Sequence, residues 1–164
     1  MKHLPKHLRP RWRYLAVELE SWPDADISRR PVQRALWYAA GNLLGDPGSA
    51  DANLRVLGFS FEDGTGEAVV RVRHGEVGPA RAAVACVDAV DGQPVRLRVR
   101  GVSGTVRACE EKYMGGPAKE RDEKRVVFRN EDRRAVQRGD SVDIETTPES
   151  DGPSFAGATR FDIQ

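Results

Sequence analysis

Four stretches of the chain have the hydrophobic and polar pattern of β-strands with one buried face. They are residues 12–20, 54–62, 68–74 and 94–102. A short glycine-containing link separates the second stretch from the third, so these two are predicted to form an antiparallel hairpin, with Gly58 marking a bulge.

Between these strands, apolar residues recur at helical spacing. The first predicted helix begins after Ser28 as N-cap, carries Pro31 in its first turn and stops before Gly45. The second is alanine-rich, covers residues 79–90 and is closed by an Asp-Gly pair. A short third helix is expected over residues 105–114.

The order strand, helix, strand, strand, helix, strand predicts an α+β domain of the ferredoxin-like or RRM-like type. In this split βαβ arrangement both helices cover one face of a four-stranded antiparallel sheet. Residues 1–114 are predicted to form the domain, with the third helix packed on the sheet or on a partner. Residues 115–164 are predicted to be a charged, largely disordered C-terminal extension, although residues 125–129 and 141–145 leave a hairpin open.

Charge is unevenly distributed along the 164 residues, whose net charge is +1. Residues 1–114 contain 17 basic and 14 acidic side chains, whereas residues 115–164 contain 9 and 11. Most basic residues are arginine, which suits bidentate contacts with phosphate, although a GC-rich genome gives the same bias. Without an apolar run that could span a bilayer or a signal peptide, a cytoplasmic protein with no membrane partner is expected.

Motifs for catalysis and metal binding are missing from the sequence. It has no phosphate-binding loop, dinucleotide fingerprint or Gly-x-Ser-x-Gly elbow, and Cys86 and Cys109 lack metal-ligand spacing. Two acidic pairs, Asp24 with Asp26 and Glu62 with Asp63, could be proposed for metal-assisted hydrolysis, but both lie beside turn signals, where such residues are common for local hydrogen-bonding reasons. No catalytic residue and no metal site are therefore predicted.

Arginines are expected to gather on the sheet face that the two main helices leave open. If Val70 and Val72 face the helices, the neighbouring arginines emerge on the opposite face. The residues concerned are Arg71, Arg73, Arg96, Arg98 and Arg100. Such a face favours a polyanion or an acidic partner, and the plain alternative is an ordinary solvated surface.

A second basic group lies at the N-terminus, where Arg9, Arg11 and Arg13 are interleaved with Trp12 and Tyr14. It is either a basic arm that follows phosphates or an ordinary solvated terminus. Because the strands lack the aromatic-rich pattern of an RRM, sequence-specific base stacking is not expected.

One motif and two supporting segments resemble a known family. Residues 102–109 (VSGTVRAC) follow a strand and open a helix, and this segment resembles the signature of the ribonuclease P protein component 2 family. The N-terminal RWRYLAVE at 11–18 and the turn GQPV at 92–95 are similar to that family as well. The resemblance extends from about residue 9 to residue 114 and leaves the extension outside it.

The resemblance implies a non-catalytic subunit of the ribonucleoprotein that removes 5′ leaders from precursor tRNA. Catalysis then belongs to the RNA and Mg²⁺, and this chain binds Mg²⁺ only through the RNA and holds no cofactor of its own. The implied partners are the ribonuclease P RNA, the TIM-barrel-like protein component 3 in a two-plus-two assembly, further ribonuclease P proteins and, indirectly, precursor tRNA. A small-molecule-sensing regulatory domain of the same fold is the alternative, and a general RNA chaperone is a third hypothesis.

Two further sets of residues receive candidate roles. The turn formed by Ser103, Gly104 and Thr105, with Arg107 nearby, either holds a phosphate at the helix start or packs on a partner protein. Leu36, Trp37 and Tyr38 are candidates for a partner interface because three consecutive large apolar groups cannot all face one core. The alternative for Trp37 is that its ring covers a helix edge. The acidic extension is interpreted as an adaptation to salt or as an arm that screens the basic face.

Overall fold

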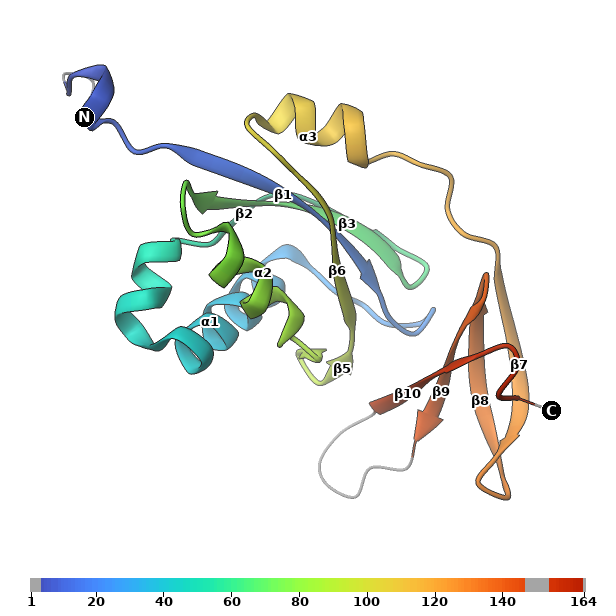
Figure 1. The fold of residues 1–164 in the computed structure, drawn as a ribbon. Coiled ribbons are helices and arrows are strands. Elements are labelled where there is room, and N and C mark those ends of the chain that lie inside the picture. Colours follow the sequence, from blue (N-terminus) through green and yellow to red (C-terminus); the bar gives the residue numbers. More distant parts are fainter. Residues whose placement is uncertain (1–3, 147–153, 164) are drawn as a thin grey trace.

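The computed structural model describes residues 4–146 and 154–163, which form two four-stranded antiparallel sheets, a two-residue ladder, three α-helices and one short 3₁₀ helix (Figure 1). The first sheet has the strand order β2-β3-β1-β6. Its part of the chain consists of η1 (Lys6–Leu8), β1 (Trp12–Glu20), α1 (Arg29–Ala52), β2 (Arg55–Glu62), β3 (Thr65–Arg73), α2 (Val77–Ala85), β6 (Arg96–Ser103) and α3 (Val106–Tyr113). This α+β architecture is compatible with the predicted ferredoxin-like fold.

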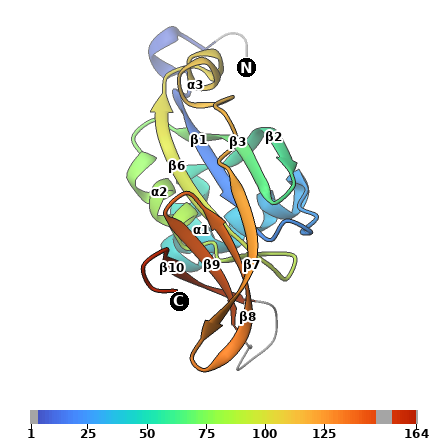
Figure 2. The same ribbon diagram turned by 90° about the vertical axis from the view of Figure 1, so that its right-hand side faces the viewer.

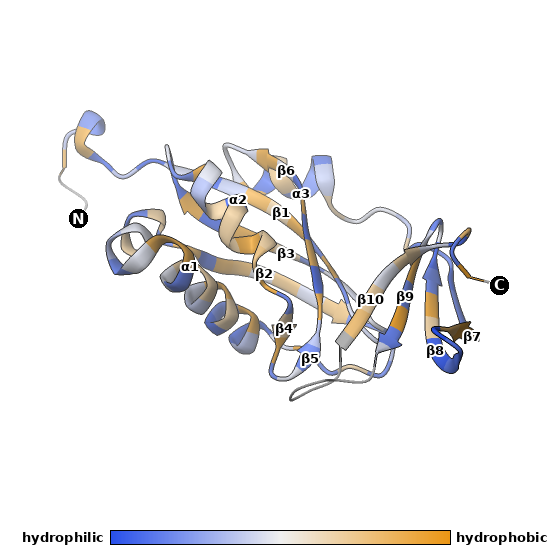
Figure 3. Cartoon of the chain, turned by 60° about the horizontal axis from the view of Figure 1, so that its bottom comes forward, coloured by the Kyte–Doolittle hydropathy of each residue, from blue (hydrophilic) through white to orange (hydrophobic). Residues whose placement is uncertain are grey.

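Helices α1 and α2 cover one face of the first sheet and bury the main core against it (Figure 1). Leu15 and Val70 from the strands meet Leu36 from α1 and Val84 from α2, and each of the four is at most 1% exposed. Helix α1 carries both hydrophobic and hydrophilic residues (Figure 3), and its buried residues are Val32, Leu36, Ala39, Ala40 and Ala52, as expected for a helix with one buried side. The apolar residues at alternate positions of β1, β3 and β6 thus form the face of the sheet that α1 and α2 cover.

Helix α3 packs on the opposite face of the same sheet, which Figure 2 shows from the side. Cys109 is fully buried against Ala16 and Val69. Burial, aided by the charge of Glu110, raises the pKa of the Cys109 thiol, so this side chain behaves as a small apolar group. Both cysteines are free, and Cys86 is exposed.

The first helix is longer than predicted because the chain becomes helical again after its break. Gly45 has φ 72° and ψ 172°, which interrupts α1 at the predicted stop. Pro47 then follows in the first turn of the resumed helix, where a missing N–H costs nothing, and the helix continues to Ala52. Gly58 lies at an irregularity in the β2–β3 register, which confirms the predicted bulge.

The second helix is shorter than predicted, since α2 ends at Ala85 rather than at residue 90. Two-residue strands β4 (Ala89–Val90) and β5 (Gln93–Pro94) pair instead across Asp91 and Gly92, which both have positive φ. An Asp-Gly pair with this geometry favours a tight hairpin, and here it prevails over the helix propensity of the alanines.

The prediction of a largely disordered extension is wrong for most of the residues that the structure describes in 115–146 and 154–163, because they form strands. Four strands, β7 (Arg121–Phe128), β8 (Glu131–Arg138), β9 (Ser141–Thr146) and β10 (Ser154–Thr159), form a second sheet in the order β10-β9-β8-β7. The two β-like stretches noted in the sequence are in β7 and β9, but each pairs with β8 rather than with the other.

The two middle strands of the second sheet bury residues on both faces, since Ala135 and Val136 of β8 and residues 142–144 of β9 are consecutive buried positions. Its own core contains Val126, Ala135, Val142 and Ile144, with charged residues between them. Tight turns at Arg129–Asn130 and at Gly139, all with positive φ, join the first three strands. The composition is polar partly because charged residues, Arg138 and Asp143, are buried in this sheet as an ion pair.

Candidate nucleic-acid interface

Helix α3 divides the predicted arginine face into two ends with different surroundings. Trp12 pairs with Arg73 and Tyr14 with Arg71 at one end of the β1–β3 ladder. At the other end of β1 the register with β6 places Glu18 beside Arg98 and Glu20 beside Arg96. We call the first the Arg71 end and the second the Arg96 end.

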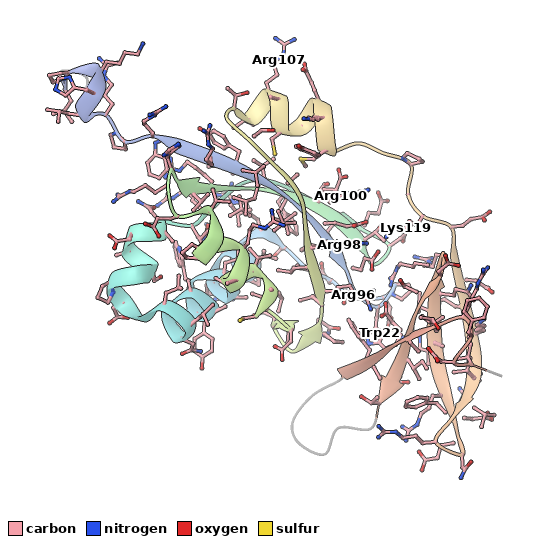
Figure 4. All side chains as sticks on the ribbon, viewed as in Figure 1. Trp22, Arg96, Arg98, Arg100, Arg107 and Lys119 are labelled. Atoms are coloured by element: carbon pink, nitrogen blue, oxygen red, sulfur yellow. The ribbon has the colours of Figure 1, made fainter. Side chains whose placement is uncertain are left out.

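At the Arg96 end, one carboxylate contacts several cations. Glu18 lies 3.3 Å from Arg98, 3.7 Å from Arg100 and 3.5 Å from Lys119, measured between side-chain oxygen and nitrogen atoms. Figure 4 shows Arg96, Arg98 and Arg100 along β6, with Lys119 nearby on the linker. Arg98 and Arg100 keep about half of their side-chain surface, at 58% and 44% exposure, so these ion pairs are weak.

Arg96 is committed to the contact between the two sheets. Its guanidinium bonds to Glu20 of β1 at 2.8 Å and also to Asp143 of β9. Asp143 accepts a second bond from Arg138, at 2.9 Å. We call these four residues together with Lys119 the intersheet charge cluster.

Opposite charges outweigh burial at two groups of the intersheet charge cluster. Burial favours the neutral form of Glu20, but the hydrogen bond and charge of Lys119, with the charges of Arg96 and Arg138, lower its pKa below the ordinary value. Burial also disfavours the charged form of Arg96, yet Asp143 and Glu20 raise its pKa. Burial prevails at the other two groups: it raises the pKa of Asp143 and lowers the pKa of Arg138. The cluster links the two sheets through hydrogen-bonded ion pairs.

Trp22 and Arg138 complete the junction between the sheets. Trp22, 5% exposed, meets the ring of Phe155 edge to face at a centroid distance of 5.8 Å, and Arg134 lies 5.1 Å from the Trp22 centroid. Arg138 donates to the backbone carbonyl oxygens of Ser21 and Gly64. Figure 4 labels Trp22 beside the second sheet.

The Arg71 end has cations without carboxylate partners. The Arg71 guanidinium lies 3.9 Å from the Trp12 ring centroid, and its Nε atom is buried without a hydrogen-bond partner. Arg73 is exposed, and no ion pair involves Arg71 or Arg73 within residues 4–146 and 154–163. This end is the part of the predicted face that presents positive charge to solvent.

The N-terminal arginines approach the same end of the sheet. Arg11 accepts a backbone hydrogen bond from His74, the residue after β3, at 2.8 Å. Arg9 is exposed and bonds to the carbonyl of Leu4, whereas Arg13 is half-buried beside Gly104. The hydrogen bond between Arg11 and His74 therefore holds the N-terminal segment at the point where it enters the sheet.

At the signature turn, Thr105 serves as the helix N-cap. Its hydroxyl accepts a hydrogen bond from the Ala108 amide at 3.1 Å, as its position before α3 predicts. Gly104 is exposed and Ser103 half-buried. Arg107 points outward from α3 (Figure 4) and pairs with Glu111 at 2.7 Å on the helix surface.

The predicted partner residues on α1 do not form one patch. Leu36 is 1% exposed in the core, so its assignment to an interface is wrong, because its position on the helix points at the sheet. Trp37 is 48% exposed, and its Nε1 donates to the carbonyl of Leu54 at 2.9 Å. Tyr38, at 75% exposure, is the most open of the three to solvent.

Sequence reasoning missed the residues that neutralise the Arg96 end. Glu18 and Glu20 alternate with core residues on β1, but their effect on β6 depends on strands that are adjacent in space and distant along the chain. Placing β1 beside β6, as the predicted fold requires, would have revealed them. Lys119 and Arg138 gave no comparable signal because their segment was expected to be disordered.

Comparison with known proteins supports the motif on which the resemblance was based. Residues 13–114 match the Rpp14/Pop5 family. The chain belongs to the Rpp14/Pop5 family. This Rpp14/Pop5 domain coincides with the first sheet and its three helices.

Several relatives of this Rpp14/Pop5 protein bear the name ribonuclease P protein component 2. The chain is 59% identical to the one from Halorubrum lacusprofundi over all 164 residues, covering 100% of both chains. Identity to the protein from Natronomonas pharaonis is 61% over 164 residues, covering 100% of this chain and 99% of the other. These comparisons give no support to the regulatory-domain alternative.

A more distant relative matches a shorter part of the chain. The Methanosarcina mazei protein is 38% identical over 114 residues, which is 70% of this chain and 93% of that one. The second sheet lies within the 164 residues that the Halorubrum lacusprofundi and Natronomonas pharaonis proteins match. Across the described ranges, no helix has the length and apolar content needed to cross a membrane.

Proposed function

We propose that this Rpp14/Pop5 protein is a non-catalytic subunit of ribonuclease P. The single observation that carries the proposal is full-length similarity, at 58–61% identity, to proteins named ribonuclease P protein component 2. In this function the chain supports the folding and activity of the RNA that cleaves precursor tRNA. Its strand order, β2-β3-β1-β6, supports the split βαβ ferredoxin-like arrangement inferred for the domain.

The Arg71 end and the N-terminal arm are the proposed RNA contacts. Arg71 and Arg73 have no carboxylate partner among the described residues, and Arg11, directly before β1, is joined by a backbone hydrogen bond to His74, the residue after Arg73. Cations placed against packed phosphates release counterions and reduce the Mg²⁺ needed to hold the RNA in its active form. Arg98 and Arg100 contribute less, because Glu18 offsets part of their positive charge. Arg96 is held by the intersheet charge cluster.

Further partners follow from the family's place in the ribonucleoprotein. We propose that the chain assembles with the ribonuclease P RNA, with protein component 3 in a two-plus-two arrangement, and with further protein subunits. Mg²⁺ enters through the RNA, and precursor tRNA is contacted indirectly. Because precursor tRNA is processed in the cytoplasm of an archaeal cell, the proposed function implies a cytoplasmic location.

Reconstituted cleavage of precursor tRNA tests the proposal. Cognate ribonuclease P RNA and component 3 are combined at limiting Mg²⁺, with this protein added or withheld. Cleavage is expected only with both proteins, and the Arg11→Ala/Arg73→Ala variant should require more Mg²⁺ for the same rate. The charge-matched Arg81→Ala/Arg125→Ala variant changes exposed arginines on α2 and β7 and should behave as wild type. No stimulation by the wild-type protein would refute the function.

A further inference from the structure

An arginine-lined groove lies where α1 begins and β2 starts. Arg29, Arg30 and Arg34 of α1 line it together with Arg55 of β2, and Gln33 and Trp37 are also among its lining residues. Arg34 forms an exposed ion pair with Asp91 at 3.3 Å. Within the described ranges, no ion pair involves Arg29, Arg30 or Arg55, and no carboxylate lines the groove. We call this hollow the α1–β2 groove.

The arginines lie at the end of α1 where positive charge is least favourable. The start of a helix carries partial positive charge from its free amides, which normally attracts acidic side chains. The first turn of α1 has no acidic residue, and Ser28 at the N-cap makes no side-chain hydrogen bond to it. An anion in the groove would offset both the arginine charges and the uncapped amides.

The indole ring of Trp37, which lines the groove, is held in position by a hydrogen bond. Trp37 donates from Nε1 to the carbonyl of Leu54 at 2.9 Å, yet its side chain remains 48% exposed. Gln33 bonds to the carbonyl of Leu54 and to the amide of Val56, at 3.1 and 2.7 Å. A ring held this way presents surface for stacking at little entropic cost.

The α1–β2 groove is continuous with the Arg71 end around the β2 edge of the sheet. Arg55 is the register partner of Arg71 across β2 and β3, and Arg71 in turn pairs with Tyr14 on β1. Arg55 thus belongs to both regions. Together they form a band of positive charge from the open face to the start of α1.

We propose that the α1–β2 groove binds an RNA strand, with phosphates on Arg29, Arg30 and Arg55 and a base stacked on Trp37. The proposal rests on the proposed function, which supplies ribonuclease P RNA as the occupant. Planar guanidinium groups match phosphate geometry, and an exposed indole accepts any base by stacking. An acidic peptide would satisfy the arginines but would leave the fixed ring of Trp37 without a matching group.

Salt-dependent binding of the full chain to transcribed cognate ribonuclease P RNA tests the groove. For Arg29→Ala/Arg55→Ala, loss of two phosphate contacts should reduce the slope of log K against log salt by roughly 1.4 to 1.8. Trp37→Leu should weaken binding by roughly tenfold with an unchanged slope, and Trp37→Phe should restore most of the affinity. Arg81→Ala/Arg125→Ala removes the same charge elsewhere and should keep the wild-type slope.

The remaining outcomes overturn the proposal in separate ways. A wild-type slope for Arg29→Ala/Arg55→Ala, or an equal loss in the control variant, excludes specific phosphate contacts in the groove. If the groove variant binds RNA normally but loses component 3, the surface serves a protein instead. Either result leaves wild-type stimulation of cleavage intact, whereas failure of the proposed function removes it. Circular dichroism and thermal unfolding of each variant confirm that it is folded.

Discussion

The ring of Tyr113, at the end of α3, lies against the backbone of Gly101 in β6 so closely that a β-carbon there would overlap ring atoms. Gly101 also faces Ala16 at the irregularity in the β1–β6 register. The absence of a side chain at this position therefore lets α3 lie flat on the sheet and bury Cys109.

Gly101→Ala is expected to displace Tyr113 and loosen α3. Overpacking of this kind costs about 1–3 kcal/mol in free energy of unfolding. Urea denaturation measures the loss. Gly116→Ala is the matched control, since a β-carbon there meets no atom within 4 Å, and its effect should stay within about 0.5 kcal/mol. Equal stability of the two variants would contradict the packing argument.

Two hydroxyl caps of the domain should differ in strength. Thr105→Ala removes the hydrogen bond to the Ala108 amide and should lower the free energy of unfolding by about 1 kcal/mol. Ser28→Ala occupies the same position at α1 but removes no side-chain cap bond. Thermal unfolding of both variants should therefore show the larger decrease for Thr105→Ala, and the reverse order would refute this assignment of caps.

Truncation of two nearby residues of α1 should change the free energy of unfolding by very different amounts. Leu36→Ala leaves a cavity in the main core and is expected to cost about 2–5 kcal/mol. Tyr38→Ala changes an exposed side chain and should alter the free energy of unfolding by less than about 0.5 kcal/mol. Guanidinium denaturation distinguishes them. A large loss for Tyr38→Ala would mean that its ring packs on the fold.

The intersheet charge cluster gives stability a specific pH dependence through Glu20. Its pKa lies below the ordinary value of 4.5, so its contribution is fully present above about pH 4.5 and is lost as pH falls through the lowered folded pKa. Glu20→Gln should therefore cost about 1–3 kcal/mol at pH 7 and progressively less in acid.

Urea unfolding at a series of pH values measures that difference between wild type and Glu20→Gln. Glu145→Gln, an exposed carboxylate on β9, serves as the control and should match wild type at each pH. A difference that stays constant down to pH 2 would show that Glu20 acts by packing rather than by charge.

Local patterns predicted the first sheet well because each of its strands carries its own alternation. The arrangement of β1, β3 and β6 with a buried row such as Leu15 and Val70 follows from that period and from the order of elements. The same period placed the arginines on one face. It could not show that Glu18 and Glu20 oppose them, because this depends on spatial neighbours.

The second sheet escaped prediction for a different physical reason. Its strand β8 (EDRRAVQR) is mostly charged, and two of its arginines are satisfied outside the sheet, Arg134 by Asp24 and Arg138 by backbone carbonyls. A sequence segment with this many charges is predicted to be exposed to solvent unless the partners of those charges are known. Composition alone cannot distinguish disorder from a sheet whose charges are matched by another part of the chain.

Arg138 contacts the first sheet through the main-chain oxygens of Ser21 and Gly64 rather than through side chains. Every chain that makes the same two turns presents those oxygens, whatever residues it has elsewhere. At this one point the second sheet is therefore held by the path of the backbone through two turns and not by the identity of side chains. Substitutions of the Ser21 side chain leave the oxygen that Arg138 binds in place.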